Sequence, residues 1–130
     1  SAAVNQWTRT WVQGGTEYRI QNKQSAELLL TCSPHDNVFV RYTAPDGKTL
    51  TSGNDDGRSL EAQTDNSDTF LINDTLSDAG GSNFEAFWNA VRKSQRIHIT
   101  ATGLTSTTFT FSNAARTLPE FDKSGCLTRM

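Results

Sequence analysis

Two cysteines, Cys32 and Cys126, are the most reactive side chains of this 130-residue chain. They lie 94 positions apart, which is too far for a local Cys-x-x-Cys metal clip. A redox or nucleophilic thiol is one interpretation, and a structural disulfide formed in an oxidising compartment is the one we favour. In the chain-entropy model, closing a loop of this length stabilises a fold by about 4–5 kcal/mol. The sequence therefore predicts a Cys32–Cys126 disulfide and a periplasmic or secreted protein.

Acidic side chains are concentrated in the middle of the chain. Residues 46–78 hold eight of the fourteen acidic residues and only two basic ones, so this segment carries −6 and the remainder +4. Such a charge distribution can steer a protein partner. We therefore predict that the acidic loops bind another protein, with four candidate contacts: Asp55, Asp56, Asp65 and Asp68. The second candidate surface is formed by basic residues near the C-terminus: Arg92, Lys93, Arg96, Arg116, Lys123 and Arg129.

The same four aspartates raise the question of a cation site, because calcium prefers clustered oxygen ligands. Placing Gly57 at the sixth position of an EF-hand loop puts Ser52 first and Gln63 twelfth, where carboxylates are required. The EF-hand pattern is therefore absent. A looser site among the aspartates is left open, and a solvated loop surface is the simpler interpretation. We predict no metal and no cofactor.

Two histidines, His35 and His98, are the candidate general bases. A histidine acts in this way only with a nucleophile or carboxylate within reach. Neither belongs to a Gly-x-Ser-x-Gly, His-Glu-x-x-His or glycine-rich phosphate-binding motif. We predict that the protein is not an enzyme; a small enzyme that pairs one of these histidines with a loop carboxylate is an alternative.

Trp7 and Trp11 are the candidates for an aromatic binding surface. With Arg9 they share one face of a strand predicted over residues 4–12, which allows cation–π stacking on a surface. An exposed pair of indoles would suit a carbohydrate-binding module or a peptide-binding surface.

The elements that must position these residues are mostly strands. Alternating apolar patterns between turn signals predict strands at 4–12, 16–21, 26–32, 38–43, 59–64, 69–73, 96–102 and 106–112. Tight turns between neighbouring strands favour antiparallel pairing.

One clear helix and one short helix complete the predicted elements. Ser82 and Glu85 fit a capping box, and Phe84, Phe87, Trp88 and Val91 follow as one apolar stripe. A short helix is predicted after Asn113 as its N-cap. We therefore predict one domain over residues 1–130, mainly β, as an antiparallel β-sandwich or curved sheet with one capping α-helix and a short C-terminal helix.

Composition excludes two classes of partner. The net charge of −2 does not suit a basic nucleic-acid-binding surface. The chain has no run of 18 apolar residues, so no membrane span is predicted.

The order of these elements resembles that of a group of bacterial envelope proteins. A strand ending in Cys32, its hairpin partner at 38–42, a long polar middle, a helix, a hairpin, a short helix and a closing Cys126 follow one another. This order is similar to small periplasmic β-sandwich proteins typified by the invasion-associated locus B family and by accessory proteins of type VI secretion clusters. The resemblance covers residues 26–127. Those families usually carry a Gly-led helix after the last strand, where this chain has Ser112-Asn113-Ala114-Ala115.

The resemblance implies a non-enzymatic role, an envelope location and protein partners. We therefore expect an extracytoplasmic protein-binding module, an accessory component of a bacterial envelope or secretion system. An immunity or inhibitor protein that blocks a toxin or hydrolase is the alternative within the binding class.

Overall fold

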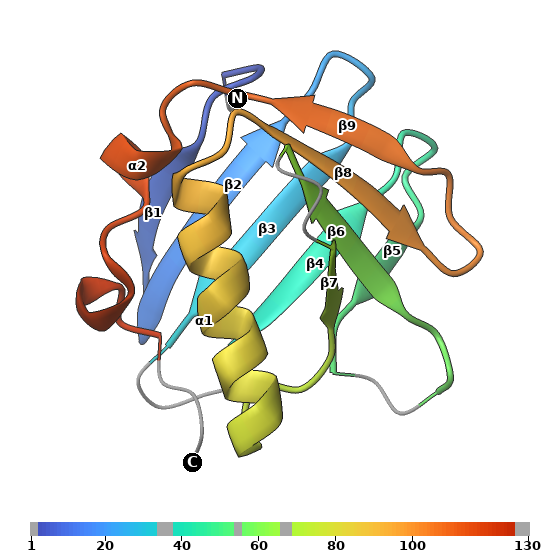
Figure 1. Cartoon of the computed structure of the whole chain (residues 1–130). Coiled ribbons are helices and arrows are strands. Elements are labelled where there is room, and N and C mark those ends of the chain that lie inside the picture. The colour runs from blue at the N-terminus through green and yellow to red at the C-terminus, as the bar shows by residue number, and fades with distance from the viewer. Residues whose placement is uncertain (1–2, 34–37, 54–55, 66–68, 127–130) are drawn as a thin grey trace.

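The computed structural model describes residues 3–33, 38–53, 56–65 and 69–126, which form two antiparallel sheets and three helical segments (Figure 1). The first sheet has the order β1 (Thr8–Val12), β2 (Gly15–Gln21), β3 (Glu27–Cys32), β4 (Phe39–Thr43), β5 (Thr49–Thr51). The second has the order β7 (Thr69–Ile72), β6 (Leu60–Thr64), β8 (Arg96–Ala101), β9 (Thr107–Thr110). The helical segments are α1 (Asp78–Arg92), α2 (Ala114–Thr117) and the 3-10 turn η1 (Phe121–Lys123). The predicted fold class is confirmed.

The first sheet is a meander of consecutive hairpins, and its first hairpin depends on two glycines. Gly14 closes the turn between β1 and β2 with φ 84°, a left-handed conformation that favours glycine. Gly15 opens β2 so close to the Cys32 carbonyl that an added Cβ would overlap that oxygen. These two positions bring the hairpin against the end of β3.

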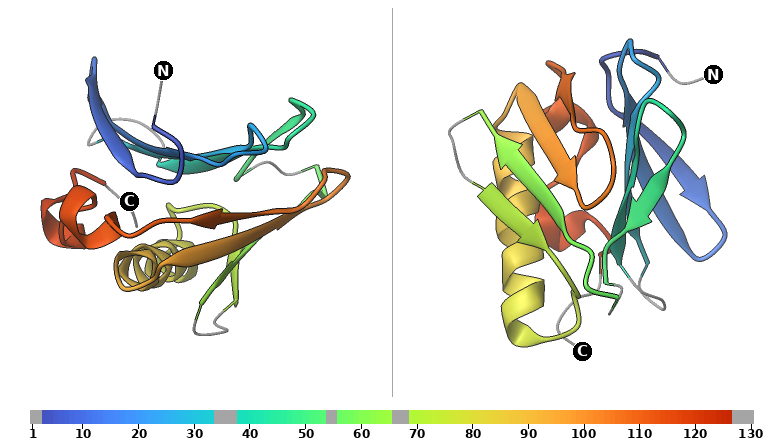
Figure 2. Two further views of the ribbon diagram at one scale, coloured as in Figure 1. Left: turned by 90° about the horizontal axis from the view of Figure 1, so that it is seen from above. Right: turned by 90° about the vertical axis from the view of Figure 1, so that its right-hand side faces the viewer.

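The two layers of the fold differ in their elements: one is the five-stranded sheet, and the other combines the four-stranded sheet with the helical segments. Figure 2 shows that the second sheet, α1 and the C-terminal helical segments lie together on one side of the five-stranded sheet. Tyr18 of β2 packs against Trp88 of α1 with ring centroids 5.0 Å apart, and Tyr42 of β4 packs against Phe109 of β9 at 6.4 Å. On the inner face of the first sheet, α1 therefore packs over β2 and the second sheet packs over β4.

The predicted apolar stripe of α1 is buried as expected, but the helix begins earlier than predicted. Ser77, not Ser82, is the N-cap, and its hydroxyl accepts a hydrogen bond from the Gly80 backbone N–H at 3.0 Å. Asp74 holds this start in place because its Oδ1 accepts from the backbone N–H of Leu76 and of Ser77. With the cap at Ser77, Gly80 and Gly81 lie in the first turn of the helix.

Several strand boundaries also differ from the prediction. The first strand begins at Thr8 rather than at residue 4, and β5 was not predicted because three residues are too few to show alternation. Asn113 precedes α2 but makes no side-chain capping bond, since its amide bonds elsewhere.

The predicted disulfide is present. Cys32 at the end of β3 is bonded to Cys126, and the described residues contain no free cysteine. Such a bond fits a protein that functions outside the reducing cytoplasm. None of the helices in the described ranges has the length and hydrophobicity that a membrane span requires.

Candidate functional site

Of the four acidic residues predicted as a contact surface, the two that the structure describes, Asp56 and Asp65, are not brought together. Asp55 and Asp68 lie outside the described residues. Asp56 precedes β6 and Asp65 follows it, so the two are separated by a strand whose five residues span about 15 Å at roughly 3.3 Å per residue. Within the described ranges, no three His, Cys, Asp or Glu side chains gather in a way that would hold a metal ion.

Each of these aspartates instead bonds its own surroundings. Asp56 accepts from Arg58 at 2.7 Å, and this hydrogen bond lowers the pKa of the carboxyl. Asp65 accepts from the Gln95 backbone N–H at 3.0 Å, which lowers the pKa of Asp65 and ties the end of β6 to the start of β8. Their carboxylates stabilise turns of this chain.

The histidines do not form a catalytic pair among the described residues. His35 lies outside those residues. His98 is half-buried on β8, opposite Gln63 of β6, and its Nδ1 lies 2.8 Å from the Thr108 hydroxyl oxygen. His98 therefore forms its hydrogen bond with a threonine hydroxyl rather than with a carboxylate.

Trp7 and Trp11 do not form a shared platform. Trp7 is 2% exposed and packs edge-on against Phe111 at 5.6 Å, whereas Trp11 is 73% exposed. The Asn113 side chain fixes the Trp7 backbone: its Oδ1 accepts from the Trp7 N–H and its Nδ2 donates to the Trp7 carbonyl, both at 2.9 Å. Trp7 is therefore a core residue, and the expectation of a two-tryptophan surface is corrected.

Trp11 borders a pocket at the edge of the five-stranded sheet. This cavity of about 380 Å³, here called the Trp11 pocket, lies between the β1–β2 hairpin and the C-terminal segment. Its lining residues are Arg9, Trp11, Val12, Gly14, Gly15, Thr16, Cys32, Lys123, Ser124 and Gly125. The β1–β2 hairpin and residues 123–125 therefore meet at this pocket, next to the disulfide.

An aromatic and cationic wall forms one side of the Trp11 pocket. The guanidinium carbon of Arg9 lies 4.6 Å from the centre of the Trp11 ring and 5.7 Å from that of Tyr18. Arg9 and Tyr18 are directly opposite in the β1–β2 register, so they share the inner face of the sheet. At an exposed site such cation–π contacts contribute about 0.5–1 kcal/mol. They hold Arg9 between the two rings.

The other wall is a fixed part of the C-terminal segment. The buried Tyr18 hydroxyl donates to the Ser124 carbonyl at 3.4 Å, and the Ser124 hydroxyl donates to the Phe121 carbonyl at 2.6 Å. Burial raises the pKa of Tyr18, and the charge of Arg9 opposes that rise only in part. With the Cys32–Cys126 bond, these contacts keep Lys123 across the pocket from Trp11.

The charges of this pocket are of one sign. Arg9 and Lys123 line it, and none of its described lining residues is acidic. No ion pair within the described ranges includes either residue, whereas Arg19 pairs with Glu17 and Arg58 pairs with Asp56. The pocket is thus suited to an apolar or aromatic group that carries a negative charge.

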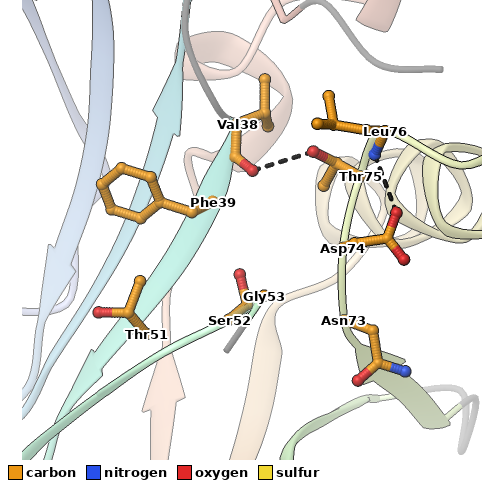
Figure 3. Close-up of a pocket in the computed structure, with 9 residues that line it drawn as sticks. All are labelled: Val38, Phe39, Thr51, Ser52, Gly53, Asn73, Asp74, Thr75 and Leu76. Carbon is orange, nitrogen blue, oxygen red and sulfur yellow. Dashed lines mark hydrogen bonds between the residues drawn. The ribbon is translucent and has the colours of Figure 1, made fainter. Parts of the chain in front are cut away.

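A second pocket of about 260 Å³ lies at the end of the fold where β4, β5 and the segment before α1 meet (Figure 3). Thr75 donates to the Val38 carbonyl at 3.0 Å across it, and Asp74 bonds the Leu76 N–H. The Thr75 bond connects the two layers and the Asp74 bond shapes the turn before α1, so these two side chains have a structural role.

Arg9 and Trp11 were predicted on an aromatic surface and Lys123 on a separate basic surface, but the sequence did not predict that they line one pocket with Lys123 in its C-terminal wall. A signal for that wall was available: once Cys126 is bonded to Cys32, residues 123–125 must lie near the end of β3. Since Thr16 pairs with Cys32 and Trp11 pairs with Thr16, the same residues must also lie near Trp11.

A family model, YfjT, matches residues 5–118. The chain belongs to the YfjT family. No curated protein and no solved structure matches it. The matched residues of this YfjT family member include β1, β2 and Cys32, and they end before Lys123 and Cys126. Nothing in these comparisons concerns invasion-associated locus B or type VI secretion proteins, so that resemblance stays a prediction.

Proposed function

We propose that this YfjT family member is a binding module of the bacterial envelope that recognises another protein through the Trp11 pocket and does not catalyse a reaction. The observation that carries the proposal is the 73% exposure of Trp11, an indole held by Arg9 at the rim of a cavity. Tryptophan and arginine are the residues most enriched among energetically dominant contacts of protein interfaces.

The edge of the sheet supports the same proposal. β1 pairs only with β2 among the described strands, so its other side is an open edge. An open edge offers unpaired backbone groups to a further strand. Val12 is 39% exposed beside Trp11, which adds apolar surface at this edge.

The chemistry of the pocket favours binding over catalysis. Cys32 is bonded to Cys126, and the Ser124 hydroxyl donates to a backbone carbonyl. No histidine or carboxylate lies among the described lining residues to activate either group. The disulfide supports a location outside the cytoplasm, which we propose to be the periplasm.

A site-specific crosslinking experiment tests this function. A photoreactive amino acid replaces Val12 in the protein expressed in the periplasm, and a matched variant carries it at Leu71 of β7, which is 45% exposed on the other sheet. We expect one discrete crosslinked protein from position 12 that is absent from position 71 and is lost when Trp11→Ala is added. The same products from both positions, or none from position 12, would contradict the proposal.

A further inference from the structure

We infer that the Trp11 pocket accepts an acidic side chain from an extended peptide segment of the partner, which adds to the open edge of β1. This inference rests on the proposed function and specifies its ligand.

Arg9 and Lys123 give the Trp11 pocket its positive charge. Both side chains are exposed, both line the pocket, and no ion pair in the described ranges includes them. Asp122, the acid next to Lys123 in sequence, lines a different surface hollow with Glu85 and Arg92. The pocket therefore presents two positive charges that the described part of the chain does not neutralise, which complements a carboxylate.

The open edge of β1 determines where the side chains of an added peptide segment lie. In a segment that extends the sheet beyond β1, alternate side chains lie on the inner face. Arg9 and Trp11 occupy that face of β1, two positions apart. A peptide with an acidic residue on the inner face can therefore approach Arg9, while an apolar residue two positions away contacts the exposed Trp11 ring.

The C-terminal wall of the Trp11 pocket is attached to the first sheet by a hydrogen bond and by the disulfide. Lys123 is in η1, which is followed by Ser124, whose carbonyl accepts from Tyr18, and by the disulfide at Cys126. A wall held in this way keeps the Lys123 backbone beside the pocket before a ligand arrives, so binding does not have to order this part of the main chain.

The test is selection from a random-peptide phage library on the intact, oxidised protein. We expect selected peptides that alternate acidic with apolar residues, and a synthetic peptide from the selection should bind with a Kd about tenfold higher after Arg9→Gln/Lys123→Gln. The control Arg116→Gln, an exposed cation in α2, should leave the Kd unchanged. Lys123 has no recorded role in the two Arg9 ring contacts, so a change at this position tests charge separately from stacking. Lys123→Glu, which reverses the charge, should therefore raise the Kd more than Lys123→Gln, which only removes it.

Three results would overturn the inference. These are selected peptides without an acidic bias, binding that is insensitive to Arg9 and Lys123, and preferential binding to phosphatidylglycerol vesicles that requires both cations. If the crosslink at position 12 is nevertheless specific and depends on Trp11, the proposed function stands and only the ligand class fails.

Discussion

Asn113 acts as a backbone partner for a segment 106 positions away in sequence. Its amide both accepts from and donates to the Trp7 main chain, in the manner of a paired strand residue. This pairing holds the Trp7 indole in the core, while Trp11, four residues on, stays exposed. The Asn113 side chain thus helps to make Trp7 a core residue, whereas Trp11 stays available as a candidate binding residue.

Asn113→Asp tests this pairing. The variant keeps the acceptor for the Trp7 N–H but places a carboxylate against the Trp7 carbonyl, so we expect the free energy of unfolding to fall by about 1–3 kcal/mol at pH 7. Urea denaturation measures the change. The matched control Asn73→Asp lies at an exposed position and should change stability by less than about 0.5 kcal/mol. Equal effects of the two substitutions would contradict the assigned role.

Asp65 provides a prediction about pH. The Gln95 N–H stabilises its carboxylate and lowers its pKa from the ordinary value of 3.8. The stabilisation is therefore present above pH 3.8 and is lost as the pH falls through the lower pKa of the folded protein. In an NMR titration the Gln95 amide resonance should move with a midpoint below pH 3.8, and Asp65→Asn should abolish the movement. A midpoint at or above 3.8 would refute the contact.

At the scale of elements, the C-terminal segment depends on the helix beside it and on the disulfide. Trp88 of α1 donates from its indole N–H to the Pro119 carbonyl at 2.8 Å, and Arg92 donates to the Leu118 carbonyl at 2.8 Å. The Cys32–Cys126 bond completes the attachment at the end of β3. The C-terminal wall of the Trp11 pocket is therefore held in place by α1, by the disulfide and by the end of β3.

Removing the disulfide tests this attachment. Cys32→Ala/Cys126→Ala should lower the free energy of unfolding by about 4–5 kcal/mol, the chain-entropy value for a separation of 94 residues. We expect both sheets to persist, so hydrogen exchange should rise first in residues 121–126. Denaturant unfolding and hydrogen exchange measure the two effects. An unchanged denaturation midpoint, or faster exchange in the second sheet than in residues 121–126, would contradict the prediction.

At the scale of the whole molecule, local signals predicted what local interactions determine. Alternation in residues 16–21 and the apolar stripe of Phe84 and Trp88 were sufficient to predict a strand and a helix, because each pattern needs only one buried face. The disulfide followed from cysteine count and spacing alone.

The features that the sequence did not predict depend on how the two layers pack, because packing decides which surfaces are buried. Trp7 and Trp11 have the same residue type and were predicted on the same strand face, but only Trp7 is covered, by Phe111. The acids at 56 and 65 are close in sequence and lie at opposite ends of β6. Neither outcome is encoded in a local pattern, because each depends on how the two layers pack.

The central claim is that Trp11 is the principal contact of a binding surface, and the affinity of the partner recovered by crosslinking at position 12 tests it most directly. Isothermal titration calorimetry compares the intact protein with Trp11→Ala and with Leu71→Ala, a control at an exposed residue of the opposite sheet. We predict that Trp11→Ala raises the Kd about 30-fold or more, which corresponds to about 2 kcal/mol, while Leu71→Ala leaves it unchanged. An unchanged Kd for Trp11→Ala would contradict the claim.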